Sequence, residues 1–203
     1  AACTGALYHI ELYVVTGGLK GLAAGVYHYG VHDNSLRMLR DGDFRQAIED
    51  ATAGNLAASS AEALIVYTTT YWRNAWKYAS RAYRHAFWDA GTVIAHTLAI
   101  ASARNLAISV LTGFSDADVN RLISVTPDRE ASVAIVTLGI DETLFPLAPP
   151  ITDLALVEIP LSRSETSFPA IIDMHHASSL TLEEMRRWGT PSRSGKSERE
   201  TRT

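Results

Sequence analysis

Residues 64–70 read LIVYTTT, a continuous run of apolar and β-branched side chains with no alternation of apolar and polar residues. Such a run is typical of a β-strand that is covered on both faces, because a half-exposed strand alternates in character. The chain must therefore place a further layer on each side of the sheet that contains this strand.

Other short segments rich in β-branched and aromatic residues predict further strands. They lie at 12–15, 25–29, 35–39, 106–111 and 131–138. Helices are expected at about 43–53, at 83–104 and in a short segment that begins near Ser115. Because the chain opens with a meander of strands, we predict an α+β sandwich, a mixed or antiparallel sheet packed with helices, and not a doubly wound sheet.

The longest predicted helix, at 83–104, has apolar residues spaced three and four positions apart, which predicts a single apolar stripe. The stripe would consist of Phe87, Ala90, Ile94, Leu98 and Ala101. Small residues such as Gly91 would leave room for another helix or a cofactor to approach closely.

Three regions are predicted along the chain. Residues 1–159 would form the main domain, and the three prolines between 146 and 150 interrupt regular structure near its end. Residues 160–189 would form a helical extension with helices at 168–180 and 181–188, the second opened by a capping box of Thr181 and Glu184. Residues 190–203 are polar and charged without apolar periodicity, which predicts a disordered tail.

The charge balance and the cysteine content exclude several classes of function. A formal net charge of −4 gives no electrostatic reason to expect a nucleic acid or an anionic membrane as partner. Cys3 is the one cysteine, so no internal disulfide is possible and a reducing cytoplasm is the expected compartment. No apolar run has the length of a transmembrane helix.

Residues 72–91 concentrate three of the four tryptophans and contain two of the eight tyrosines. Aromatic faces attract cations and stack on flat rings, so a segment that combines aromatic residues with arginine and lysine could recognise a planar or anionic ligand. The alternative is that these rings belong to the buried face of a helix, since aromatic residues dominate core burial.

Three motifs add a family resemblance. Residues 76–91, WKYASRAYRHAFWDAG, resemble the signature WKYxxRAYRxxxxDAG of the SagB-type dehydrogenases, the azoline-oxidising branch of the FMN-dependent nitroreductase superfamily. Residues 2–15 are similar to that family's PSAGALYPLELYVV, and residues 21–29 to its GLxxGxYHY turn and strand. The resemblance implies a nitroreductase-like α+β fold, FMN as cofactor, and a homodimer or a second nitroreductase-like half as partner.

The resemblance also assigns residues that would contact the flavin. Cys3, Thr4, Gly5 and Leu7 lie in the loop that approaches the ring and the ribityl chain in this family, and a glycine suits such an approach because it has no Cβ. Thr112 and Gly113 match the loop whose backbone N–H faces flavin N5. From the residues alone, Gly5 and Gly113 could equally be ordinary turn glycines.

Lys77 and Tyr78 match the Lys-Tyr pair that is regarded as catalytic in azoline oxidases. Oxidation of an azoline to an azole removes a ring proton as hydride leaves, and a lysine can accept that proton if burial or nearby cations lower its pKa. Adjacent residues on a regular helix diverge by about 100°, so both can face one substrate only where the backbone is irregular. The alternative is a solvated lysine beside a core tyrosine.

The sequence departs from the family pattern in the first loop and at the positions that would bind the FMN phosphate. Ala2 and Cys3 stand where the family has Pro-Ser, and His9 stands where it has a later proline. No arginine-rich segment precedes the first loop and no cation occurs in 139–145, so the usual ligands of the FMN phosphate are not evident. The histidine and cysteine spacings do not predict a metal site.

These observations predict an FMN-dependent oxidoreductase that dehydrogenates a heterocycle, azoline to azole, in a modified peptide. One alternative is a degenerate, non-catalytic half that acts in dimerisation or peptide binding. Another is an NAD(P)H-dependent nitro or quinone reductase. The opening of the chain inside a motif further suggests a piece of a longer, tandem protein whose N-terminal part is missing.

Overall fold

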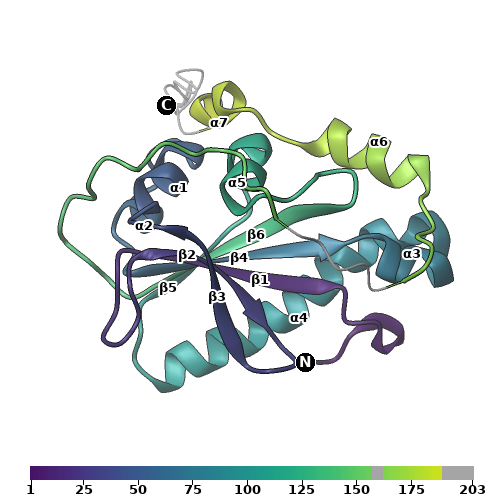
Figure 1. Ribbon diagram of the computed structural model, residues 1–203, viewed down its shortest axis with the longest axis horizontal. Helices are drawn as coiled ribbons and strands as arrows, with labels where there is room; N and C mark the ends of the chain where they lie inside the picture. The colour runs from purple at the N-terminus through teal and green to yellow at the C-terminus, as the bar shows by residue number, and fades with distance from the viewer. Residues whose placement is uncertain (157–161, 189–203) are drawn as a thin grey trace, which may run out of the picture.

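The computed structural model describes residues 1–156 and 162–188, and in them a six-stranded antiparallel sheet has the order β3-β2-β1-β4-β6-β5 (Figure 1). The predicted strands are confirmed, although the fifth begins two residues later than expected. Their bounds are Ile10–Thr16 (β1), Gly25–Gly30 (β2), Ser35–Asp41 (β3), Ala63–Thr70 (β4), Ile108–Leu111 (β5) and Glu130–Leu138 (β6).

Helices cover both faces of this sheet, as the apolar character of β4 requires (Figure 1). Helices α1, α2 and α5 lie on one face, and the long helix α4 crosses the other. The α+β sandwich predicted from the order of elements is therefore confirmed. The helix bounds are Arg45–Ala51 (α1), Leu56–Ser59 (α2), Trp72–Tyr78 (α3), Ala82–Ala103 (α4), Asp116–Ile123 (α5), Pro169–Ser178 (α6) and Leu182–Trp188 (α7), with short 3-10 turns at Thr4–Ala6 and Ala79–Arg81.

Alternate residues of β4 belong to two separate cores. Leu64 and Val66 are fully buried in the core beneath α1 and α5, whereas Tyr67 is buried in the core beneath α4. Because β4 pairs with β1 on one side and β6 on the other, neither edge of it is exposed. This placement accounts for a seven-residue run without a solvent-facing position.

The predicted apolar stripe of α4 is wrong in part. Ala90, Ile94 and Ala101 are buried, but Phe87 and Leu98 are 47% and 37% exposed. The face turned to the sheet includes Ala86 and Ala90, whose small side chains let the helix backbone approach the strands. A Cβ at Gly91 would meet nothing within 4 Å, so this glycine lies on an open surface of the chain and not against a neighbouring helix.

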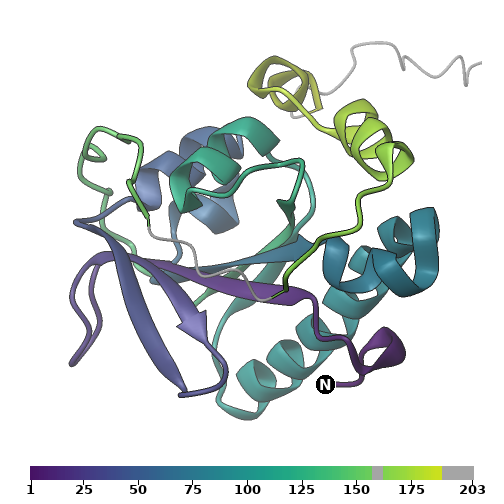
Figure 2. The ribbon, with the colours of Figure 1, turned by 45° about the vertical axis from the view of Figure 1, so that its right-hand side comes forward.

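The two C-terminal helices pack outside the sandwich. Ile171 of α6 is buried with Tyr71, Ala75 and Ala82 in a third, smaller core, and Figure 2 shows the yellow-green α6 lying above α3. Glu184 accepts hydrogen bonds from the Thr181 N–H and hydroxyl, both at 2.8 Å, which confirms the predicted capping box. The predicted tail at 190–203 and the residues 157–159 of the predicted main domain lie outside the described part of the chain.

Within residues 1–156 and 162–188, none of the helices combines the length and the apolar character that crossing a membrane requires.

Candidate functional site

The N-terminal loop that precedes β1 folds into a compact turn against α3 and α4. Gly5, Ala6 and Tyr8 all have left-handed backbone conformations, with φ of 66°, 55° and 47°. The Ala6 N–H donates to the Cys3 carbonyl at 3.0 Å and closes the turn. Three left-handed residues in four positions are costly for a free chain, so the surrounding structure must hold this loop in place.

Asp89 on α4 is the group that anchors the loop. It is buried and accepts hydrogen bonds from the Thr4 N–H at 2.9 Å, the Thr4 hydroxyl at 2.8 Å and the His9 Nε2 at 2.8 Å. The Cys3 thiol donates to the same carboxylate at 3.2 Å. Four groups from a seven-residue segment thus converge on one side chain 80 to 86 positions away.

The electrostatics of this anchor follow from burial and hydrogen bonding. Burial raises the pKa of Asp89, but the hydrogen bonds from Thr4, Cys3 and His9 together outweigh it and hold that pKa below its ordinary value. Burial also lowers the pKa of His9 by more than the neighbouring Asp89 raises it. The stable arrangement at neutral pH is therefore an ionised Asp89 beside a neutral His9 imidazole.

Lys77 and Tyr78 meet the loop at Gly5. A Cβ on Gly5 would lie 2.7 Å from the Tyr78 hydroxyl and 3.2 Å from Lys77 Nζ, so both side chains lie directly over this glycine. Helix α3 ends at Tyr78 because Ala79 adopts φ 50° and ψ −143°, which no helix accommodates. The irregular backbone that the sequence analysis required for two adjacent side chains to face one point is present here.

Two buried polar residues support Tyr78. The His85 ring lies edge-on to the Tyr78 ring with centroids 4.7 Å apart, and His85 Nδ1 is 2.7 Å from Asn74 Oδ1. Asn74 in turn donates to the Thr4 carbonyl at 3.4 Å. These contacts join the Lys-Tyr segment, α4 and the N-terminal loop into one connected set.

The Lys77 side chain is exposed, so residues of this chain alone do not bury it. Its ammonium lies 5.4 Å from the centroid of the Tyr78 ring, within reach of a cation–π interaction. Arg73, four residues before Lys77, donates to Glu11 at 2.5 Å and to the Tyr8 carbonyl at 3.0 Å.

A cavity of about 660 Å³ opens beside the loop, and neither Lys77 nor Tyr78 lines it. Apolar and aromatic side chains predominate in its wall, as in most sites for flat organic ligands. Its lining includes Cys3, Tyr8, Ile10, Leu12, Tyr29, Val31, Asp89 and Val93, with Glu11, His28 and Arg73 as further polar members.

The residues of the loop and of this cavity fit the ring of a flavin better than its phosphate. Of the loop residues assigned to the flavin, Cys3 lines this cavity whereas Thr4, Gly5 and Leu7 do not, and Tyr8, Tyr29 and the β1 residues Ile10 and Leu12 offer flat apolar surface. Arg73 is the one arginine among the described lining residues, and its guanidinium is paired with Glu11. Burial raises the pKa of Glu11, but hydrogen bonding to His28 and the charge of Arg73 outweigh it and lower that pKa, so the pair is ionic.

The structure does not bring together all of the residues that the resemblance assigns to the cofactor. Cys3, Thr4, Gly5 and Leu7 share the loop, and the Thr4 N–H is already used by Asp89. Thr112 and Gly113 follow β5, which β4 and β6 separate from β1 in the sheet. Neither residue lines the cavity beside the loop.

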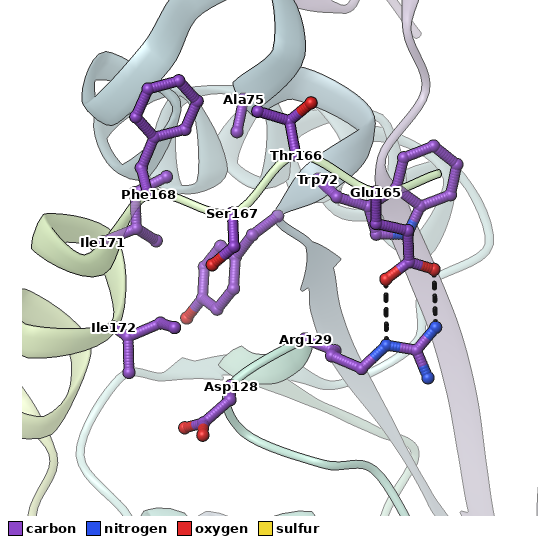
Figure 3. A pocket seen from close by; sticks show the side chains of 11 residues that line it. Trp72, Ala75, Asp128, Arg129, Glu165, Thr166, Ser167, Phe168, Ile171 and Ile172 are labelled. Carbon is purple, nitrogen blue, oxygen red and sulfur yellow. Dashed lines mark hydrogen bonds and ion pairs between the residues drawn. The ribbon is translucent and has the colours of Figure 1, made fainter. Parts of the chain in front are cut away.

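A second, smaller cavity of about 170 Å³ lies where the segment before α6 crosses α3 (Figure 3). Arg129 donates to both carboxylate oxygens of Glu165, at 3.0 and 2.6 Å, and this pair closes one side of the cavity. Phe168 and Ile171 form the opposite side in Figure 3. No residue of the N-terminal loop lines this cavity, which forms where α6 and the segment before it pack against α3.

Sequence reasoning missed Asp89, Asn74 and His85 as site residues. Asp89 is the Asp of the DAG triplet and was visible as part of a motif, but its role as an anchor for residues 3–9 depends on a contact across more than 80 positions. Asn74 and His85 carried no local signal.

Comparison with known proteins agrees with this architecture. The family model described as "Nitroreductase family" matches residues 3–140. A putative nitroreductase from Anabaena variabilis is 26% identical with a TM-score of 0.73, and the match covers 89% of this chain and 37% of that one. The Escherichia coli microcin synthetase McbBCD complex with truncated pro-MccB17 bound is 21% identical with a TM-score of 0.61, covering 70% and 55% of the two chains.

A putative nitroreductase from Ralstonia eutropha is 15% identical with a TM-score of 0.52, covering 66% of this chain and 59% of that one. The chain thus spans less than two thirds of the length of each of these three proteins. No curated protein matches it. The family model covers well over half of the sequence, and the fold superposes on that of the Anabaena variabilis protein with a TM-score of 0.73. The chain therefore belongs to the nitroreductase family.

Proposed function

We propose that this chain is an FMN-dependent oxidoreductase of the SagB type, which dehydrogenates an azoline to an azole in a modified peptide. The observation that carries the proposal is the position of Lys77 and Tyr78, two adjacent side chains that both lie over Gly5. A plain helix would have turned one of them away. The end of α3 at Ala79 makes this arrangement possible.

Each residue has a distinct part in the proposed reaction. Bound FMN would supply the hydride acceptor, and residues 3–7 would hold its ring chiefly through backbone groups, since the Cys3 and Thr4 side chains bind Asp89. Lys77 accepts the proton that leaves the azoline ring, and the Tyr78 hydroxyl donates a hydrogen bond to the ring heteroatom. One proton and one hydride leave together, so the product is lighter by two hydrogens.

The exposure of Lys77 fits a site that is completed by another surface. One chain leaves the Lys77 side chain exposed to solvent, whereas closing a site around the reacting groups excludes water and strengthens the electrostatic interactions inside it. A homodimer or a second nitroreductase-like half would cover it and could bring a Thr112–Gly113 loop to the flavin. A peptide as substrate is consistent with the peptide bound to the microcin synthetase complex.

The test begins with flavin binding. The purified protein is incubated with excess FMN, passed through gel filtration and examined for a visible flavin band, and the flavin-loaded protein is then given a thiazoline-containing peptide. We expect Lys77→Ala to retain flavin and to lose about 100-fold or more in turnover, the usual contribution of a general base. Lys20→Ala, at another exposed lysine, is the matched control and should behave as the parent protein.

Unchanged turnover in Lys77→Ala would remove the assignment of the base. The conservative change Tyr78→Phe tests the other half of the pair, because it keeps the ring against His85 and removes only the hydroxyl.

One observation favours a second candidate, a non-catalytic half that acts in dimerisation or peptide binding. The cavity beside the loop has one arginine among its described lining residues, and that arginine is engaged with Glu11. Charge-assisted contacts normally hold the FMN phosphate, so their loss weakens binding. A colourless protein that still binds the peptide would support this candidate, whereas reduction of a nitroaromatic or quinone driven by NAD(P)H would instead indicate a nitro or quinone reductase.

A further inference from the structure

Two departures from the family pattern converge in space. Cys3 stands where the family has serine and His9 where it has proline, and the structure places both side chains on Asp89. Cys3 Sγ, His9 Nε2 and Asp89 Oδ2 all lie within 4.8 Å of one another. Sulfur, imidazole nitrogen and carboxylate oxygen are the three ligand types that zinc takes from proteins.

Each of these three side chains is oriented by a partner of its own. The Tyr8 N–H donates to Cys3 Sγ at 3.1 Å, and the Thr69 hydroxyl lies 2.8 Å from His9 Nδ1. Thr4 holds the Asp89 carboxylate with its hydroxyl at 2.8 Å from Oδ1 and with its N–H at 3.1 Å from Oδ1 and 2.9 Å from Oδ2. Metal ligands in proteins are usually held by such outer contacts, which leave one ligand atom of each side chain facing a common point.

The Thr69 hydroxyl suits both the metal-free and the metal-bound form of His9. Without metal, Nε2–H donates to Asp89 and Nδ1 accepts from the hydroxyl. With metal, Nδ1–H donates to the hydroxyl and Nε2 is free to coordinate, because a hydroxyl can both donate and accept. The imidazole remains neutral in both forms, which burial favours, since burial lowers the pKa of His9.

The cluster is buried on one side and open on the other. His9 is fully buried and Asp89 is 5% exposed, whereas Cys3 is only partly buried. Cys3 and Asp89 both line the cavity of about 660 Å³. Three protein ligands with a fourth position open to a cavity is the arrangement of zinc sites that bind water or substrate, whereas closed structural sites have four protein ligands.

The charges also match a dication. Asp89 is ionised, because its hydrogen bonds outweigh the burial that raises its pKa. Burial and the bond to Asp89 raise the pKa of the Cys3 thiol, so this thiol is protonated in the metal-free protein. A bound dication displaces that proton, as it does for cysteine ligands in general. Binding therefore releases one proton from Cys3 and leaves a thiolate, a carboxylate and a neutral imidazole around the ion.

We propose that Cys3, His9 and Asp89 form a three-ligand site for a divalent transition-metal ion, Zn²⁺ by its ligand chemistry, with the fourth position open to the cavity. The present spacings are 2.8 Å between His9 Nε2 and Asp89 Oδ2 and 3.2 Å between Cys3 Sγ and Asp89 Oδ2. Ligand atoms around tetrahedral zinc lie about 3.3–3.7 Å apart. Side-chain rotations that open the cluster by roughly half an ångström would admit the ion.

Co²⁺ as a spectroscopic substitute for Zn²⁺ provides the test, on the full chain under reducing conditions. We expect one equivalent to produce a thiolate-to-cobalt band in the near ultraviolet together with visible bands of a four-coordinate ion. Added Zn²⁺ should displace the Co²⁺ and abolish both sets of bands. None of these readouts depends on flavin binding or turnover. The metal site and the proposed flavin-dependent function are therefore tested independently, and either can be refuted while the other is supported.

Variants identify the ligands. Cys3→Ser should remove the near-ultraviolet band, and His9→Gln should weaken binding at least tenfold. Thr69→Val, which removes only the outer contact to His9, should weaken it about 10–100-fold. His28→Gln is the matched control, because His28 lines the same cavity but binds Glu11, and it should leave the titration unchanged.

Absence of a stoichiometric complex in the parent protein would overturn the proposal and leave the cluster as a hydrogen-bonded anchor for the loop. Equal binding by the parent, Cys3→Ser and His9→Gln would overturn it as well. If a variant does not fold, X-ray absorption of the zinc-loaded parent decides the matter. One sulfur in the coordination shell supports the site, and a shell of oxygen and nitrogen alone refutes it.

Discussion

At the scale of single residues, the candidate site depends on a glycine and on a few buried polar side chains rather than on the aromatic residues that dominate the sequence. Gly5 lets Tyr78 and Lys77 approach the N-terminal loop, and Asp89 holds that loop on α4. By contrast, Trp76 and Trp88 are 58% and 55% exposed, so the concentration of tryptophans in 72–91 is only partly explained by core packing. Ala75 and Ala82 are buried in the third core with Tyr83 packed against it, so core packing accounts for part of this segment, and ligand recognition by its exposed rings stays a prediction.

Gly5→Ala should disturb both the loop and the Lys-Tyr pair. The added Cβ would meet the Tyr78 hydroxyl at 2.7 Å, and φ of 66° is unfavourable for alanine, so we expect a loss of about 1–3 kcal/mol in unfolding free energy. Denaturant unfolding measures this loss. Gly91→Ala is the control, because its Cβ meets nothing within 4 Å in a helix interior, and it should stabilise by about 0.5–1 kcal/mol. A stable Gly5→Ala protein would show that the loop is not packed as described.

Glu130 gives a residue-scale prediction for the dependence of stability on pH. It accepts hydrogen bonds from Tyr13 at 2.9 Å and Thr68 at 2.6 Å, and burial raises its pKa above the usual value. As pH rises, Glu130 therefore ionises in the unfolded chain before it ionises in the folded chain. Its contribution to the unfolding free energy is present below the unfolded pKa and is lost as pH rises through the folded pKa.

Glu130→Gln keeps the acceptor and removes the titration. We therefore expect the variant to be increasingly more stable than the parent as pH rises from 4 to 8, with each unit of raised pKa worth about 1.4 kcal/mol. Chemical unfolding at several pH values would measure the difference. A difference that does not change with pH would contradict a buried, protonated Glu130.

At the scale of elements, the break between α3 and α4 is the decisive local feature. The sequence predicted one long helix beginning near residue 83, and the structure begins α4 at Ala82. The structure also contains the short helix α3 and a 3-10 turn, both of which precede α4. The aromatic and cationic composition of this segment had predicted no boundaries for these elements. Because Ala79 has a conformation otherwise confined to glycine, this break is imposed by the packing of α3 and α4 and not by a local breaker residue.

Ala79→Gly should therefore stabilise the protein. Relief of a backbone strain of about 1–3 kcal/mol exceeds the entropic cost of a glycine, which is about 0.5–1 kcal/mol, so a net gain of roughly 1 kcal/mol is expected. Thermal or denaturant unfolding measures it. Ala95→Gly, at an exposed position inside α4, is the matched control and should lose about 1 kcal/mol. A loss in both variants would mean that Ala79 is not strained.

At the scale of the whole molecule, stability should depend on three buried histidines that folding keeps neutral. Burial lowers the pKa of His9 in the loop anchor, of His85 beside Tyr78 and of His175 on α6. Below about pH 6.5 the unfolded chain takes up protons that the folded chain does not. The stability that these histidines contribute is present above that pH and is lost as pH falls through their folded pKa values.

The measurement is unfolding free energy between pH 7.5 and 5, made in Glu130→Gln so that the opposite titration of Glu130 does not mask the effect. We expect a progressive loss of stability over this range, and a smaller slope when His175→Gln is added. A flat profile would show that the three imidazoles are not kept neutral by folding.

The sequence by itself determined the sandwich. Apolar periodicity and turn residues act locally, so the strands, the long helix and the capping box of α7 could be predicted within one or two residues, and β4 had to be central because its run has no polar face. The spacing of apolar residues did not show which face of α4 is buried. Ala86 is fully buried whereas the adjacent Phe87 is 47% exposed, because the small alanine side chain lets the helix backbone lie close to the sheet. The Lys-Tyr pair and the loop were identified by resemblance, and their roles remain predictions.

Only the tertiary structure decided what these residues contact. Cys3, His9 and Asp89 carry no spacing signal, because their proximity depends on how the loop before β1 meets α4. The meeting of Lys77, Tyr78 and Gly5 likewise requires the end of α3 at Ala79, which is a strained conformation that local preference disfavours. Local propensities select elements, whereas contacts between residues far apart in the chain are fixed by the packing of the whole molecule.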